Sequence, residues 1–213
     1  MELSRPVDGI YSKGRRRSSF TPMLESPSHS DGDLLRLLSG GDREAFLAFY
    51  RRHQAAVYRF ALQMSGRAEI AEEATQDVFV AVMRAARQYD QQRGSVTGYL
   101  YGIARNVVLR ALERERPYAA ALEDASSSTP QLIADRDLAA ELAHSERIET
   151  LRKAVLALPP AYREAVVLCD LHEMDYADAA AAVGCPVGTI RSRLHRARAL
   201  LLEKMRAAER CVV

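Results

Sequence analysis

The side chains that could hold a metal ion lie in the C-terminal third of this 213-residue chain. Cys169 and His172 have a Cys-x-x-His spacing, and Cys185 follows them. A structural zinc site takes four ligands, and a fourth is not apparent, so we expect both cysteines to be small buried residues. The sequence also shows no glycine loop for phosphate and no nucleophile beside an orienting base. We therefore expect no metal, no cofactor and no enzyme activity.

Arginines near the C-terminus indicate a different chemistry, the binding of phosphates and base edges. Residues 187–206 contain five arginines and one lysine against a single acid, Glu203, which leaves a net charge of +5. Apolar residues at helical spacing form one stripe, which comprises Ile190, Leu194, Ala197 and Leu201. The residues expected to face duplex DNA are Val187, Gly188, Thr189, Arg191, Ser192, His195 and Arg196. A solvated amphipathic helix is the alternative.

The turn before this basic helix decides between the two interpretations. Asp175 can cap a short alanine-rich helix, and Gly184 can supply the left-handed residue that ends it. Pro186 can begin the next helix only near its first turn. This punctuation predicts a helix-turn-helix, which places its second helix in the major groove, so DNA binding is favoured.

A polar loop at residues 90–97 is a second candidate for nucleic-acid binding, followed by a helix from Gly98 to about Arg116 that Pro117 ends. Tyrosine rings beside amides and arginines suit unstacked bases, because rings stack on bases while arginines hold phosphates. The residues expected at this site are Arg93, Gly94, Ser95, Tyr99, Tyr101, Arg105 and Asn106. In the alternative, both tyrosines are core residues. The stripe expected to face inward comprises Leu100, Ile103, Val107 and Ala111.

A helix expected at residues 68–88 carries more apolar surface than one core requires. Its expected core stripe comprises Ile70, Ala74, Ala81 and Ala85. The remaining set, a candidate protein-binding surface, comprises Glu73, Asp77, Phe79, Val80, Met83 and Arg84. In the alternative, Phe79 and Met83 are ordinary core residues.

Hydrophobic periodicity predicts an all-α protein with two small helical domains joined by a flexible linker. Residues 1–32 lack an apolar period and form a flexible arm, whose arginines 15–17 either touch phosphate or stay in solvent. The first domain spans residues 33–117 and the second 147–206, with a tail at 207–213. The linker at residues 118–146 is acidic, with a helix beginning near Asp135. The first stripe of the second domain comprises Ile148, Leu151, Val155 and Leu158.

Composition indicates the general class of the protein and the cell compartment in which it is expected to act. Apolar residues make up 48% of the chain, which suffices for packed cores, and the net charge of +2 requires that any nucleic-acid surface come from local segregation of charge. Three cysteines without a repeated spacing argue against a disulfide framework and favour the cytoplasm. No apolar run approaches the roughly 18 residues of a membrane span, and the N-terminus lacks the apolar centre of a signal peptide.

Four segments, in this order, give the chain a specific resemblance to a known family. They are residues 71–79 (AEEATQDVF), 99–106 (YLYGIARN), 158–165 (LPPAYREA) and 184–198 (GCPVGTIRSRLHRAR). Together they resemble a bacterial RNA polymerase sigma factor of the extracytoplasmic-function (ECF) group, in the sigma-70 family. The resemblance covers about residues 33–205.

The resemblance implies partners for each segment. It implies that residues 71–84 bind the clamp helices of the polymerase beta-prime subunit, and that the loop at 90–97 with its following helix opens and holds the minus-ten promoter element. It further implies that the linker threads the polymerase cleft, that the last two helices read the minus-35 element while docking on the beta flap, and that an anti-sigma protein is a further partner.

Two positions depart from the family pattern. Tyr99 stands where the family usually has tryptophan, and Arg110 where it usually has aspartate; both bear on the minus-ten preference rather than on the family. The alternative function is a one-component transcription regulator, with a C-terminal helix-turn-helix and an N-terminal sensor or dimerisation domain.

Overall fold

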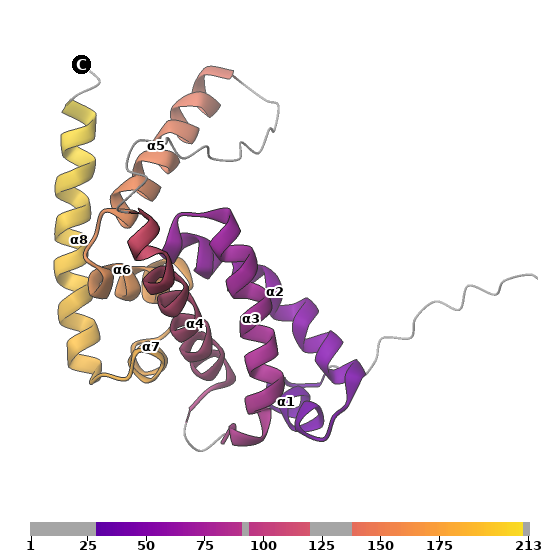
Figure 1. Ribbon diagram of the computed structural model, residues 1–213. Coiled ribbons are helices and arrows are strands. Elements are labelled where there is room, and N and C mark those ends of the chain that lie inside the picture. The colour runs from indigo at the N-terminus through magenta and orange to yellow at the C-terminus, as the bar shows by residue number, and fades with distance from the viewer. Residues whose placement is uncertain (1–28, 91–93, 120–137, 211–213) are drawn as a thin grey trace, which may run out of the picture.

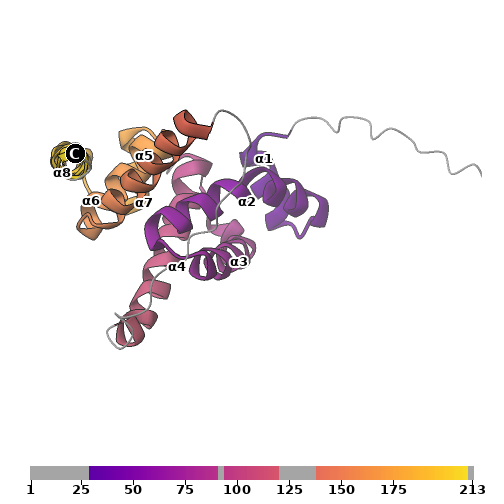
Figure 2. The same cartoon turned by 90° about the horizontal axis from the view of Figure 1, so that it is seen from above.

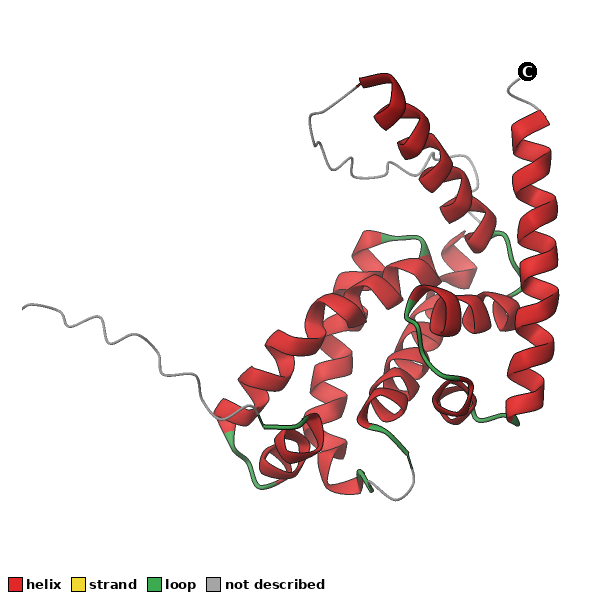
Figure 3. Ribbon diagram, turned by 180° about the vertical axis from the view of Figure 1, so that it is seen from behind, coloured by secondary structure: helices red, strands yellow, loops and turns green. Residues whose placement is uncertain are grey.

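The structure is a computed structural model that describes residues 29–90, 94–119 and 138–210. All regular structure in these ranges is helical, with eight α-helices and no strand (Figure 3), so the predicted all-α fold class is confirmed. Arginines 15–17, Arg93, most of the predicted arm and linker, and Cys211 lie outside the described residues. Within the described part, none of the helices combines the length and apolarity needed to cross a bilayer.

The N-terminal half packs three helices, α1 (Asp31–Ser39), α2 (Arg43–Ser65) and α3 (Ala68–Ala85), with a 3-10 turn, η1 (Ala86–Gln88), after α3 (Figure 1). Polar residues set the helix starts: Asp42 accepts a hydrogen bond from the Ala45 amide at 3.0 Å. Gly66 ends α2 in the left-handed conformation, at φ 74°. The core of this half is formed by Leu34, Leu35, Phe49, Val57, Phe60 and Met64.

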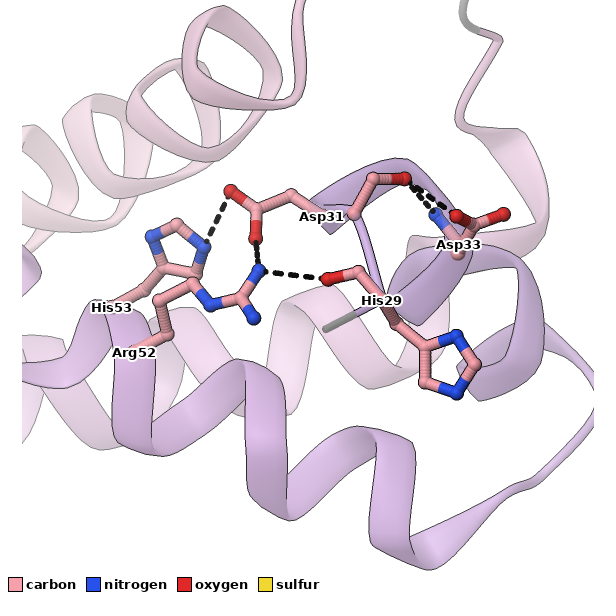
Figure 4. Close-up of polar contacts among 6 residues, drawn as sticks. His29, Asp31, Asp33, Arg52 and His53 are labelled. Carbon is pink, nitrogen blue, oxygen red and sulfur yellow. Dashed lines mark hydrogen bonds and ion pairs between the residues drawn. The ribbon is translucent and has the colours of Figure 1, made fainter. Parts of the chain in front are cut away.

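A polar cluster fastens the start of α1 to the middle of α2 (Figure 4). The Asp31 carboxylate lies between Arg52 and His53, with the His53 Nε2 3.1 Å from Asp31 Oδ2. Arg52 also donates to the His29 carbonyl at 3.2 Å. Because these groups are partly exposed, their ion pairs add little to the free energy of unfolding. Their main effect is to orient the start of α1 on α2.

Helix α4 (Val96–Ala119) crosses the molecule and packs against α2 and α3 on one side and α7 on another. Its buried residues include Leu100, Ala104 and Val108, whereas Ile103 and Val107 are half-buried. The predicted inward stripe is therefore wrong by one position over part of the helix, because two neighbours on different sides decide which residues are covered. The helix also runs two residues past Pro117, where its end was predicted.

The C-terminal half contains α5 (Leu138–Leu156), α6 (Pro160–Val166), a π-helical turn η2 (Val167–Leu171), α7 (Tyr176–Val183) and α8 (Val187–Arg210). Val155 on α5 and Leu158, two residues after this helix ends, are buried as predicted. Ile148 and Leu151 are exposed, so that part of the predicted stripe is wrong. Helix α5 meets the other described helices toward its C-terminal end (Figure 1), so its burial begins only at Ala154 and Val155.

The two halves are in contact. Helices α6 and α7 lie between α8 and α4 (Figures 1 and 2). The Arg163 guanidinium on α6 donates to the Met64 carbonyl of α2 at 2.7 Å and to the carbonyls of Leu156 and Leu158 near the end of α5. A cation at the C-terminal ends of two helices also complements both helix dipoles.

Candidate nucleic-acid interface

The helix-turn-helix predicted from Asp175 onward is confirmed in its local geometry. The Asp175 carboxylate accepts hydrogen bonds from the amides of Ala177 and Asp178, each at 2.8 Å. Gly184 ends α7 at φ 75°, and α8 begins one residue after Pro186. The predicted apolar stripe of α8 packs inward, since Ile190, Leu194 and Ala197 are buried and Leu201 is half-buried.

The inward stripe leaves the predicted minus-35 residues on the outer side of α8. Gly188, Arg191, Ser192, His195 and Arg196 are exposed, and Val187 and Thr189 are half-buried. The surface is cationic near the start of the helix, where a major-groove helix presents side chains to base edges.

Two arginines of α8 have partners that the sequence did not indicate. The Arg191 guanidinium lies 5.8 Å from the centre of the Tyr176 ring, which lies at the first residue of α7. Arg198 donates to both carboxylate oxygens of Asp170, at 2.6 and 3.1 Å. The Tyr176 ring thus orients Arg191 without fixing its position, whereas the ion pair with Asp170 holds Arg198 in place. Tyr176 was missed; its signal was an aromatic residue opening the helix before the recognition helix.

The predicted minus-ten loop ends in a side-chain cap at the start of α4. Ser95 Oγ accepts from the Gly98 amide at 2.9 Å and so begins α4. The Tyr99 hydroxyl donates to the Ala85 carbonyl at 2.7 Å, and its ring lies 5.2 Å from the ring of Tyr89. Burial raises the pKa of Tyr99. Tyr99 is therefore held half-buried at the surface, with a second aromatic ring beside it.

Tyr101, by contrast, is a core residue, so the expectation that it offers a ring to an unpaired base is wrong for this structure. It is only 6% exposed and makes an edge contact with Phe60 at 5.3 Å. Burial raises its pKa to about 12. A position two residues after Tyr99 on a helix points to a different side, and here that side faces Phe60 of α2 and His172.

The Tyr101 hydroxyl belongs to a partly buried chain of hydrogen bonds with His172 and Gln63. His172 Nε2 lies 2.9 Å from Gln63 Oε1, and because an amide oxygen only accepts, Nε2 carries the proton. Tyr101 then donates to Nδ1 at 2.6 Å. Burial, with a smaller contribution from Arg59, lowers the pKa of His172 to about 4. Both ring nitrogens are thus in use, and the described residues contain no group of three or more side chains suited to a metal.

Arg105 and Asn106 lie next to one another on α4 but differ in environment. Asn106 is exposed. Arg105 Nη2 lies 3.0 Å from Oε1 of Glu164, a carboxylate on α6 that is 4% exposed. Arg105 Nε has no hydrogen-bond partner among the described residues, so the guanidinium keeps a free donor beside the pair.

A cleft of about 560 Å³ joins these features. One wall is α4 and the turn before it, with Tyr89, Tyr99 and Ile103; the other is the end of α7, with Ala182 and Val183. Its volume is within the range of small-molecule sites, about 300–1,000 Å³. The predicted minus-ten residues Gly94, Arg105 and Asn106 also line it.

The predicted protein-binding surface on α3 is largely exposed. Val80 and Met83 are among the most exposed large apolar residues of the described chain, and Asp77 and Arg84 flank them. Glu73 is exposed and pairs with Arg114 at 3.0 Å.

Phe79 was predicted to belong to this surface, but it is a core residue. It is 2% exposed, and its ring contacts those of Tyr50 at 4.7 Å and Phe49 at 6.5 Å. The core stripe of α3 runs through Val78, Phe79 and Val82 rather than through Ala81 and Ala85, which are half-buried. Because α2 and α4 both cover α3, the larger residues are the ones that fill the core.

Comparisons with known proteins agree with this layout. Residues 49–118 match the family model for Sigma-70 region 2, and residues 148–201 match the model for Sigma-70 region 4. The ECF RNA polymerase sigma factor SigM of Mycobacterium tuberculosis is 34% identical over 173 residues, which cover 81% of this chain and 83% of that protein. SigE of Mycolicibacterium smegmatis is 36% identical over 150 residues, 70% of this chain, and the match spans only 56% of that longer protein.

Solved structures share the fold. CnrH, in complex with the cytosolic domain of CnrY, superimposes with a TM-score of 0.62 at 26% identity, over 84% of this chain and 99% of that one. RpoE of Bartonella quintana, in complex with the anti-sigma factor NepR, gives a TM-score of 0.60 at 24% identity, over 76% and 96% of the two chains. The second likeness supports the fold alone.

These matches decide between the two functions considered from the sequence. The N-terminal helices match sigma region 2, so they are not the sensor or dimerisation domain of a one-component regulator. With region 2 preceding region 4, and SigM matched over most of its length, the chain belongs to the extracytoplasmic-function group of bacterial RNA polymerase sigma factors.

Proposed function

We propose that this chain binds core RNA polymerase and directs it to promoters by two surfaces, the outer face of α8 for the minus-35 element and the surface around Ser95 and Tyr99 for the minus-ten element. The observation that supports this most strongly is the outer face of α8. Its cations are exposed while its apolar stripe is buried, and a capped helix and a left-handed glycine turn position it.

At the minus-ten element, the proposed site takes up a base that has left the stack. Unstacking a base costs a few kcal/mol, and the uptake site must offset that cost. Tyr99 and Tyr89 provide neighbouring rings that line the cleft, and base stacking on one ring contributes about 1–3 kcal/mol. Asn106 offers an exposed amide nearby for a base edge.

Polymerase binding is assigned to the exposed residues of α3, namely Asp77, Val80, Met83 and Arg84, with Glu73 beside them. An apolar pair flanked by charges of both signs is typical of a protein interface with a polar rim. Phe79 is left out of this surface because it lies in the core.

An anti-sigma protein is a further proposed partner. RpoE of Bartonella quintana was solved with the anti-sigma factor NepR, and this chain shares its fold. Core polymerase is a cytoplasmic enzyme, so we propose that the chain acts in the cytoplasm and has no catalytic activity of its own.

The function is tested by asking whether promoter binding depends on core enzyme. Run-off transcription with core polymerase on genomic fragments should yield discrete start sites only when the chain is added. The same fragments should be bound specifically by the holoenzyme and not by the chain alone. Specific binding by the chain alone, unaffected by polymerase, would contradict the proposal.

Strand opening is tested separately at the minus-ten site. Tyr99→Ala combined with Arg93→Ala should leave closed-complex binding to duplex promoter nearly unchanged and impair opening, measured by permanganate footprinting. A template with a premelted minus-ten region should recover much of the transcription, because melting has already been supplied. Wild-type footprints in the double variant, with an unchanged circular dichroism spectrum, would overturn the assignment.

A further inference from the structure

The region 4 half of the chain contacts region 2 along the side of α4 that carries the proposed minus-ten residues. The Ser95 hydroxyl, which caps α4, donates to the carboxylate of Asp178 on α7. Arg105, about two and a half turns after the start of α4, pairs with Glu164 of α6 at 3.0 Å. Between them, Tyr101 is hydrogen-bonded to His172, the residue that ends η2. Three successive contacts thus join one side of α4 to three elements of region 4.

Small residues bring the two backbones together. Gly98 and Gly102 lie one helical turn apart on α4 and face α7. A Cβ added at Gly98 would lie 3.3 Å from Asp178 Oδ1, and one at Gly102 would lie 3.6 Å from the Ala182 Cα. This approach encloses the proposed uptake cleft from its second side, because the end of α7 lines it.

The side chains of α4 that make these contacts are hydrogen-bond donors, which DNA binding also requires. Arg105 and Ser95 were assigned to promoter DNA because a guanidinium and a hydroxyl donate to anionic oxygens. In this structure each already donates to a carboxylate oxygen of region 4. Glu164 and Asp178 therefore occupy, with their own negative charge, donors that a phosphate would otherwise take.

We propose that region 4 has a second role in this chain: it is an intramolecular competitor of minus-ten DNA, with Glu164 and Asp178 holding Arg105 and Ser95 until the domains separate. The proposal rests on the minus-ten assignment made above. It follows that the free chain binds single-stranded DNA only through its open fraction, and that its apparent Kd is the intrinsic Kd divided by that fraction. Polymerase, by holding the two domains apart, would remove the competition.

The variant Glu164→Gln tests whether loss of this carboxylate frees Arg105 to bind DNA. In Glu164→Gln the closed form keeps a partly buried Arg105 without its counter-charge, whereas the open form loses nothing, so the balance shifts to the open form. The free variant should bind a labelled single-stranded DNA of mixed sequence about tenfold more tightly than wild type. Glu113→Gln, an exposed position on α4 with the same change of charge, is the control and should match wild type. Equal affinities of Glu164→Gln and Glu113→Gln would overturn the proposal.

A reversible lock tests it in the opposite direction. The side chains of Ser95 and Asp178 touch, so Ser95→Cys with Asp178→Cys should form a disulfide on mild oxidation. The oxidised protein should lose binding to the same probe, and reduction should restore it, while Ser95→Cys alone should respond to neither treatment. Failure of the disulfide to form, or full binding by the locked form, would contradict the proposal.

Holoenzyme binding separates this idea from the function on which it rests. If wild-type holoenzyme binds promoter fragments and the free variants behave as wild type, only the competition is wrong. If wild-type holoenzyme binds no promoter fragment, the sigma function itself fails, and the competition fails with it.

Discussion

Phe79 and Met83 lie about one helical turn apart on α3 but in opposite environments. Phe79 is enclosed by α2, whereas Met83 is 48% exposed. We predict that Phe79→Ala lowers the free energy of unfolding by about 3–5 kcal/mol, because a large core side chain leaves a cavity. Met83→Ala should change it by less than about 0.5 kcal/mol. Urea titration measures both.

Exposed residues of α3 allow polymerase binding to be tested without a loss of stability. Met83→Ala combined with Asp77→Lys should weaken competition for core enzyme while the urea midpoint stays near that of wild type. Normal competition by this double variant would remove α3 from the polymerase interface. Phe79→Ala is unsuitable for that test, since reduced folding would mimic reduced binding.

Arg191 and Arg196 are expected to act by different routes on minus-35 DNA. Arg191→Ala should relax sequence preference by about 1–3 kcal/mol, because it lies early on the recognition helix, where side chains reach base edges. Arg196→Ala should weaken binding on all sequences and reduce the salt slope by about 1. Binding to a set of single-base promoter variants at two salt concentrations distinguishes them. The same loss on every sequence for both variants would refute the division.

Tyr176 refines that expectation. Its ring lies under Arg191, so Tyr176→Phe should keep the sequence preference and Tyr176→Leu should blunt it. Loss in both variants would assign the effect to the hydroxyl rather than to the ring face.

At the scale of elements, the cap of α7 should be measurable on its own. Asp175→Ala leaves two amides without their acceptor and should lower the free energy of unfolding by about 1 kcal/mol, while Asp175→Asn should cost less. Chemical denaturation gives both values. Equal losses for Asp175→Asn and Asp175→Ala would show that charge, not hydrogen bonding, dominates at this cap.

Features fixed by neighbouring residues were predictable. The Asp175 cap, the Gly184 turn and the buried stripe of α8 depend on residues within a few positions, and the structure contains all three. The core side of α3 was not predictable in the same way. Both candidate stripes follow helical spacing, and only the packing of α2 and α4 around the helix selects the one that includes Phe79.

Contacts between the domains were beyond the reach of sequence patterns. Arg105 and Glu164 are 59 positions apart, and Ser95 and Asp178 are 83 apart. Each member also has a plausible local role, Ser95 as a cap and Asp178 as an acid in the first turn of α7. Nothing local marks these residues as partners, because their pairing depends on how α4 and α7 meet.

For the whole molecule, acid should loosen the junction of the two halves. His172 is neutral in the folded state, with its pKa lowered to about 4 by burial and by Arg59, and it meets Tyr101 and Gln63. The unfolded chain binds a proton below its ordinary pKa of about 6.5, so between about pH 6.5 and 4 it holds more protons than the folded chain. Stability therefore falls as the pH falls through this window, by about 2 kcal/mol after screening.

Urea midpoints at pH 7 and pH 5 check this expectation. His172→Gln removes the titrating ring and should reduce the difference between the two pH values. If the variant keeps the full pH dependence of wild type, another group is responsible.

Helix α7 packs on α4 with one side and on α8 with another. Packed helices lie about 8–10 Å apart, so the axes of the two DNA-reading helices come within about 20 Å of each other in this arrangement. The two promoter elements are named for positions about 25 base pairs apart, or about 85 Å along the duplex at 3.4 Å per base pair. A chain in this form thus cannot reach both elements at once, and simultaneous binding requires the domains to move apart by tens of ångströms.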